Sequence, residues 1–191
     1  MTTDVLEGRK DRAELYRRYP AGSVVIYNAT TIVHFLAGAV AIYVGYDFAP
    51  AIALSAAVLY TVFAFVEMYI VMPLSVCPNC VYSALDGSLC VAGLNVLSRR
   101  IAKEGRRADF ENRAKGILCP NNLYLASLAL PIIAGIPALF VHFAPTLLAL
   151  WLALAALLAF RFFVIFPHIA CLHCYGKFRC PQAGAMGVRE R

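Results

Sequence analysis

The chain has 191 residues, of which 61% are hydrophobic, and its mean hydropathy is +0.71. One soluble core of this size cannot bury so much apolar surface, so a water-soluble globular fold is excluded and lipid must be the main solvent. The formal net charge is +6, but the basic residues come without aromatic or glycine-rich interleaving. They therefore favour membrane-orientation signals over nucleic-acid binding.

Residues 1–20 are predicted to form a short N-terminal surface helix. Arginine and lysine are interleaved here with aspartate and glutamate, and no apolar core is present. We therefore expect no cleavable signal and a retained N-terminus. The few apolar side chains are expected to rest on the membrane surface or on a partner protein. Pro20 and Gly22 end this helix.

Residues 24–74 are predicted to form the first transmembrane hairpin. The stretch from Val24 to Tyr46 is long enough to cross about 30 Å of hydrocarbon at about 1.5 Å per residue. Small residues spaced four apart within it allow close helix packing in lipid. The connection at 47–50 has room only for a tight turn, so the second span runs back antiparallel.

Residues 75–120 form the one large polar insertion, a cysteine-containing loop that is predicted to be amphipathic. Leu94, Leu97 and Ile101 recur at helical spacing, which predicts a helix lying on the bilayer. Oppositely charged residues four apart predict a second short helix over 107–115. The loop is therefore expected to lie at the membrane surface.

Residues 121–166 are predicted to form the second transmembrane hairpin, and residues 167–191 a cysteine-rich tail. Apart from Arg161, every lysine and arginine lies in the N-terminal arm, the loop or the tail, so these parts are expected to be cytoplasmic. The predicted location is the cell inner membrane or cytoplasmic membrane, with several passes and with both termini and all cysteines inside. Thiols in that reducing compartment favour metal ligation or redox chemistry over structural disulfides.

One short motif occurs twice. Residues 73–80 and residues 167–174 both have the pattern Pro-x-x-x-Cys-x-x-Cys, at an offset of 94 residues, and each follows a long apolar run. Two spans separate the copies, so the copies share orientation and their axis is expected to follow the membrane normal. The predicted fold is thus an all-α integral membrane protein with four transmembrane helices, arranged as two like-oriented helical hairpins (an internal repeat) with a cytoplasmic Cys-rich metal-binding layer.

Each motif supplies half of a four-ligand metal site, since two thiolates need two more ligands from elsewhere. Joining both motifs predicts one centre in the layer. A second arrangement divides all seven cysteines between two centres, with His168 or His173 as the eighth ligand. The candidate metal ligands are Cys77, Cys80, Cys171, Cys174, Cys90, Cys119, Cys180 and His168. An iron-sulfur cluster is the favoured cofactor, zinc is the alternative, and metal-free thiol chemistry or transient soft-metal handling stays open.

Two charged residues, Glu67 and Arg161, each lie six residues before the proline of their motif. A lone charge at that depth costs several kcal/mol unless it is paired or hydrated. We interpret the two as an ion pair between the hairpins, with a proton path or the binding site of a quinone headgroup as the alternative. His34, in the first span, is interpreted as a buried histidine bonded to a neighbouring helix rather than as a haem ligand.

These features predict a membrane-embedded metal-binding protein, which acts as an electron-transfer or anchoring subunit of a membrane redox complex. The expected partners are the lipid bilayer, protein subunits of that complex and a quinone as electron acceptor, without nucleic acid. Catalytic residues are not identified, so an oxidoreductase role is expected only at the level of a subunit. A zinc-stabilised scaffold that docks partners and a thiol-based carrier of soft metals are the alternatives.

Overall fold

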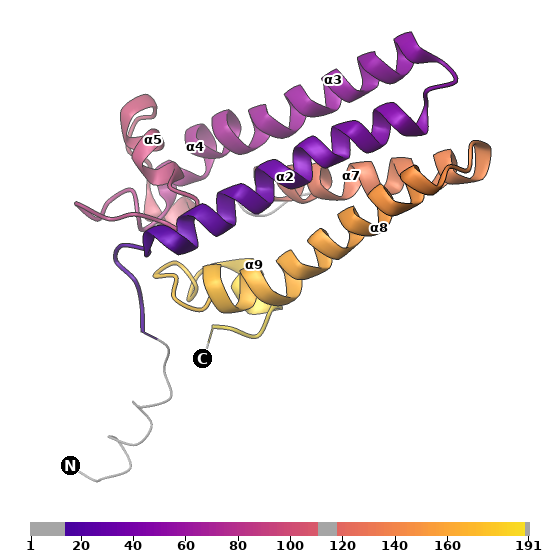
Figure 1. The fold of residues 1–191 in the computed structure, drawn as a ribbon. Helices are drawn as coiled ribbons and strands as arrows, with labels where there is room; N and C mark the ends of the chain where they lie inside the picture. Colours follow the sequence, from indigo (N-terminus) through magenta and orange to yellow (C-terminus); the bar gives the residue numbers. More distant parts are fainter. Residues whose placement is uncertain (1–13, 111–117, 190–191) are drawn as a thin grey trace, which may run out of the picture.

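The computed structural model describes residues 14–110 and 118–189, and every regular element in this part of the chain is a helix (Figure 1). Four helical stretches are long and apolar enough to cross a membrane: Ala21–Gly45, Pro50–Asn79, Pro120–Val141 and Pro145–Ala170. The predicted all-helical fold with four candidate membrane spans is confirmed at this level. The described helices are α2 (Ala21–Gly45), α3 (Pro50–Val66), α4 (Met72–Ser75), α5 (Leu94–Ile101), α7 (Pro120–Val141), α8 (Pro145–Phe160) and α9 (Pro181–Ala185).

Two spans change their winding before they end. A π-helical turn, Glu67–Val71, connects α3 to α4, and a longer π-helical segment, Arg161–Ala170, continues α8. Each of these segments begins at the charged residue of its span. π-Helical turns are rare in proteins overall, and many of those that occur lie at functional sites.

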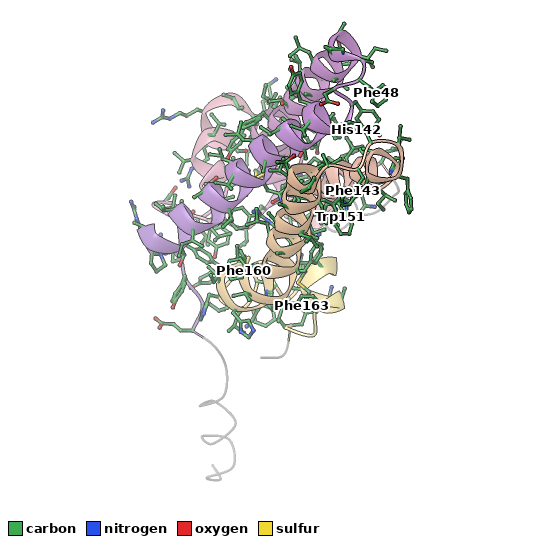
Figure 2. The ribbon with its side chains drawn as sticks, turned by 45° about the vertical axis from the view of Figure 1, so that its right-hand side comes forward. Phe48, His142, Phe143, Trp151, Phe160 and Phe163 are labelled. Carbon is green, nitrogen blue, oxygen red and sulfur yellow. The ribbon has the colours of Figure 1, made fainter. Side chains whose placement is uncertain are left out.

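Proline marks the start of three spans and short turns join them. In α3, α7 and α8 a proline occupies the first turn, where its missing N–H costs no hydrogen bond. At the end where the short turns lie, Asp47 Oδ1 is 3.7 Å from His142 Nε2, and Figure 2 shows Phe48 and Phe143 beside them. The helices therefore alternate in direction, and the loop and the tail meet at the opposite end.

Glycine allows α2 to approach its neighbours closely. A Cβ atom at Gly38 would lie 2.7 Å from the Tyr60 hydroxyl oxygen and 2.9 Å from Pro131 Cγ. A Cβ atom at Gly45 would lie 2.9 Å from the Cβ of Ala138. These contacts join α2 to α3 and α7, as expected for small-residue packing in lipid.

Replacing Gly38 by Ala is expected to destabilise the fold by about 1–3 kcal/mol. Tyr60 cannot move aside freely, because its hydroxyl donates to Ser127 O at 3.1 Å. Gly22, in the same helix, is the matched control, since a Cβ there meets nothing within 4 Å and Ala should gain up to about 1 kcal/mol of helix propensity. Thermal unfolding in detergent measures both variants, and equal shifts would contradict the close contact.

The N-terminal arm differs from the prediction. Residues 14–20, named the strap here, are not helical, while residues 1–13 of the predicted helix lie outside the described residues. The backbone N–H of Tyr16 donates to His173 O at 2.9 Å, and the strap forms a parallel bridge to Leu89. The tail and the loop thus use the backbone groups that a helix would have kept for itself, which is why the helical prediction was wrong for 14–18.

The loop contains the predicted amphipathic helix as α5. Leu97 and Ile101 are 36% and 48% exposed, in keeping with a face that meets the bilayer. Asn95 is buried and holds the start of the loop, since its amide donates to Ser88 O at 3.0 Å. Of the second predicted helix, residues 107–109 form one 3₁₀ turn and residues 111–117 lie outside the described part.

Candidate functional site

Six cysteines gather at the end of the bundle opposite the short turns. Two of them end the second span, two follow the fourth span, one precedes α5 and one precedes α9. Figure 1 shows α4, α5 and α9 at this same end. We name the set the thiol layer: Cys77, Cys80, Cys90, Cys171, Cys174 and Cys180, all of them free thiols.

The six thiols lie near enough to one another that a thiolate at one of them would raise the pKa of neighbouring thiols, and this proximity is named the thiol network. Cys80 is at its centre, because it interacts with Cys77 and Cys90 on its own side and with Cys174 and Cys180 on the tail. Cys171 completes the network through Cys174 and Cys180. The two Cys-x-x-Cys motifs therefore meet, and they meet through Cys80 and Cys174.

Burial favours the protonated form of three thiols that lie outside the spans, Cys80, Cys171 and Cys174. It raises the pKa of Cys80 and of Cys171 to about 12, and that of Cys174 higher still. Backbone N–H groups act in the opposite direction at two sulfurs. Those of Val81 and Tyr82 lower the pKa of Cys80, and the N–H of residue 176 lies 3.3 Å from Cys174 Sγ. N–H groups that face sulfur stabilise thiolate, the form that binds metal.

Tyr82 joins the three segments that carry the layer. Its ring is buried, and its hydroxyl donates to Tyr16 O in the strap at 2.7 Å. The same hydroxyl accepts the N–H of Tyr175 at 3.3 Å. In addition, the Tyr19 hydroxyl of the strap donates to Ala170 O just before the second motif. The strap, loop and tail are thereby fixed to one another around the sulfurs.

Thiols are the ligands that soft metals prefer, but the positions of these thiols do not form a metal site. Within residues 14–110 and 118–189, no group of three or more His, Cys, Asp or Glu side chains is arranged to hold a metal ion. Each sulfur would have to move to about 2.3 Å from a shared ion. A metal centre here would therefore draw the sulfurs together as it bound, with metal binding coupled to local folding.

The remaining candidate ligands lie outside the thiol layer as defined above, and two of them make other contacts. Cys119 is the N-cap of α7, where its sulfur accepts the N–H of Asn122 at 3.4 Å. His173 contacts the strap, since Nδ1 is 2.7 Å from Glu14 O and its ring stacks on Tyr16 at 4.3 Å. His168 is exposed. The ligand roles of Cys119, His173 and His168 stay predictions.

The predicted ion pair between Glu67 and Arg161 does not form, although both side chains are buried. The Nη2 group of Arg161 instead donates to Tyr27 O at 3.2 Å and to the hydroxyl of Thr31. Within the described residues, Glu67 Oε1 and Arg161 Nε have no hydrogen-bond partner. The interpretation as a pair was wrong because the rotation of each helix, and not only its depth, decides where its charge faces.

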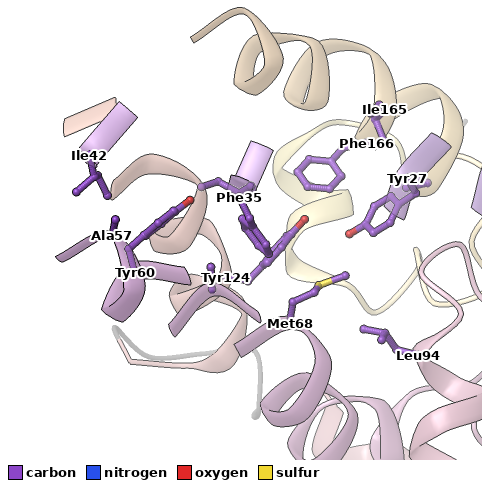
Figure 3. Packing of buried hydrophobic residues seen from close by; sticks show 13 residues of the cluster. Tyr27, Phe35, Ile42, Ala57, Tyr60, Met68, Leu94, Tyr124, Ile165 and Phe166 are labelled. Carbon is purple, nitrogen blue, oxygen red and sulfur yellow. The ribbon is translucent and has the colours of Figure 1, made fainter. Parts of the chain in front are cut away.

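Aromatic rings surround the Arg161 guanidinium. Its carbon lies 4.8 Å from the ring of Tyr27, 5.8 Å from that of Tyr124 and 5.6 Å from that of Phe166. Figure 3 shows these rings gathered in the interior near Met68. Faces of aromatic rings attract cations by about 2 kcal/mol or more when water is excluded. The sequence indicated the buried charge but not these partners, which come from three different elements.

His34 links α2 to α7 at the centre of the bundle. Its side chain is 1% exposed and its Nε2 lies 2.8 Å from Leu128 O. The interpretation of His34 as a histidine bonded to a neighbouring helix is confirmed.

No protein family, no characterised protein and no solved structure matches the chain.

Proposed function

We propose that this chain is an electron-transfer or anchoring subunit of a membrane redox complex, whose thiol layer binds an iron-sulfur centre. The observation that supports this most is the single network of six thiols at one end of the bundle, drawn from segments about a hundred residues apart. Such a centre supplies reversible one-electron chemistry when bound. The chain supplies the thiols, the N–H groups that face two sulfurs, and the burial that excludes water.

The charge distribution supports a cytoplasmic thiol layer. Arg99 and Arg100 lie in the last turn of α5 at the end that carries the thiols, and the two short turns at the other end contain no lysine or arginine. Basic residues are retained on the cytoplasmic side. A partner that donates electrons would then reach the layer from the cytoplasm.

Two observations support an internal repeat with an axis through the bundle. The π-helical segments begin at Glu67 and Arg161, which are one repeat length apart. His34 contacts Leu128, and these two positions are also separated by 94 residues. Equivalent positions meet where a pseudo-twofold axis passes. Such symmetry would present both motifs at the same depth.

Metal analysis with a spectrum tests the proposal. Protein purified without oxygen should be brown, should contain iron and acid-labile sulfide, and should be bleached by dithionite. Colourless protein with stoichiometric zinc would contradict the electron-transfer function and favour the zinc-stabilised scaffold. Protein without any metal would contradict both the iron-sulfur proposal and the zinc-stabilised scaffold.

A quinone in the adjacent groove is the proposed electron acceptor. A groove of about 690 Å³ runs between α7, α8 and the π-helical continuation of α8 and is lined by Trp151, Phe162 and Phe163 among other apolar residues. Figure 2 shows Trp151 and Phe163 along the same stretch of α8 and its continuation. The groove includes Pro167, four residues before Cys171, or about 6 Å along a helix. An isoprenoid quinone there would be both in the membrane and near the thiols.

A short-chain ubiquinone is expected to quench the fluorescence of Trp151, the one tryptophan of the chain, because quinones accept an electron from excited indole. Ala155→Phe fills the groove and should weaken the binding that quenching reports by more than about tenfold, roughly 1.4 kcal/mol. The matched control is Ala39→Phe in the separate groove between α2 and α3. Equal titration curves for both variants would contradict the assignment.

A further inference from the structure

A second pocket, of about 280 Å³, opens directly on the thiol layer. Cys80, the last residue of the first motif, and the adjacent Val81 line it on one side, and Tyr175, Phe178 and Arg179 line it from the tail. It is distinct from the apolar groove beside α8, with which it shares no lining residue. The thiol that it reaches is the one at the centre of the network.

The walls of this pocket combine three kinds of group. Arg179 is exposed and contributes a positive charge, while Tyr175 and Phe178 are 38% and 53% exposed and offer ring faces. None of the described residues that line the pocket is an aspartate or a glutamate. A pocket whose lining includes both a cation and a thiol suits an anion that presents a soft atom.

Close packing connects the pocket to the second motif as well. The N–H of Gly176 points at Cys174 Sγ, and a Cβ atom at Gly176 would lie 3.4 Å from that sulfur and 3.9 Å from Val81 Cγ1. These are ordinary van der Waals distances, so the chain at residue 176 packs where the wall of the pocket crosses from one motif to the other. A ligand bound in the pocket would contact the seam at which the two motifs meet.

We propose that this pocket binds a small anionic complex of a soft metal ion with a thiol and passes the metal to Cys80. The inference rests on the proposed function, in which the thiol layer takes up a metal. In the transfer step a bond forms between the Cys80 sulfur and the metal while the bond between the metal and the carrier thiolate breaks. The proton leaves Cys80 with the carrier, so the products are the Cys80–metal thiolate and the free carrier thiol, without any change in oxidation state.

The charge preference of the pocket can be measured on the full-length protein without metal. Methanethiosulfonate reagents with a sulfonate group or with a trimethylammonium group react with thiols, and peptide mass spectrometry reports the rate at Cys80. After division by each reagent's rate with a free thiol, we expect the anionic reagent to modify Cys80 at least tenfold faster. Arg179→Gln should remove this preference, whereas Arg100→Gln, an exposed change on α5, should retain it.

Zinc delivered as its complex with glutathione gives the second measurement. The wild-type chain should take up this zinc faster than Arg179→Gln does, while uptake of aquated zinc should be equal for the two. Equal modification of Cys80 by both reagents, or a preference that survives in Arg179→Gln, would overturn the inference. The modification experiment needs no assembled centre, so its outcome is separate from that of the iron-sulfur proposal. Far-ultraviolet circular dichroism confirms that each variant is folded.

Discussion

Cys80→Ser is expected to empty the metal centre of the purified protein, whereas Cys119→Ser is expected to leave its metal content unchanged. Cys80 interacts with thiols on both sides of the layer. A hydroxyl at that position cannot supply a soft thiolate ligand. Removal of a ligand should cost at least the roughly 10–100-fold in metal affinity that loss of an outer hydrogen-bond partner costs.

Cys119 is a suitable control because serine can take over what its sulfur does. The residue is the N-cap of α7, and serine is among the best N-cap residues. Metal per protein, measured by mass spectrometry after anaerobic purification, compares the two variants. Loss of metal from Cys119→Ser to the same degree as from Cys80→Ser would show that the centre is not built where the thiol network lies.

Arg161→Met is expected to keep the thermal stability of the fold or to raise it. A buried charge without a counter-ion costs several kcal/mol in lipid, and hydrophobic replacement of buried ions is often neutral or stabilising by about 1–4 kcal/mol. The Thr31 hydroxyl donates to Tyr27 O at 2.7 Å. This hydrogen bond does not involve Arg161, so the hydroxyl keeps its acceptor in the methionine variant. Such a result would indicate that Arg161 is retained for function and not for stability.

Phe35→Ala is the destabilising reference for this comparison. Its ring is fully buried and lies 5.5 Å from that of Phe65, so its truncation should cost about 3–5 kcal/mol. A loss of that size from Arg161→Met would show that the guanidinium is a structural element. Because Arg161 and Glu67 form no ion pair, the effects of Glu67→Gln and Arg161→Gln should also add to within about 0.5 kcal/mol.

Cys90 and Cys180 show what spacing alone left undecided. Counting along the chain assigned the first centre to the two motifs and kept these two cysteines as additional ligands of a second arrangement. In the folded chain Cys90 lies with Cys77 and Cys80, and Cys180 lies with Cys171 and Cys174. Their positions follow from the path of the loop and the tail: Asn95 accepts the backbone N–H of Cys90, and the Tyr82 hydroxyl accepts that of Tyr175.

The strap shows the same limit in the N-terminal arm. Residues 14–20 belong to the stretch that was expected to be a surface helix of mixed charge with few apolar side chains. Two segments more than 60 residues away supply the hydrogen bonds that hold the strap in its non-helical form. Local propensity is worth only tenths of a kcal/mol per residue, so such tertiary contacts outweigh it.

The sequence by itself determined the number of candidate spans, their short turns and the end of the bundle at which the cysteines lie. Each of these depends on hydropathy and on hydrogen bonds within one helix, which are local in the chain. Only the tertiary structure decided which sulfurs are neighbours, that Arg161 faces aromatic rings and not Glu67, and that Cys80 lines a pocket. Those features depend on how each helix is rotated about its axis. Spans that are apolar on every side contain no pattern that specifies this rotation, so close packing of side chains such as Tyr60 against Gly38 sets it instead.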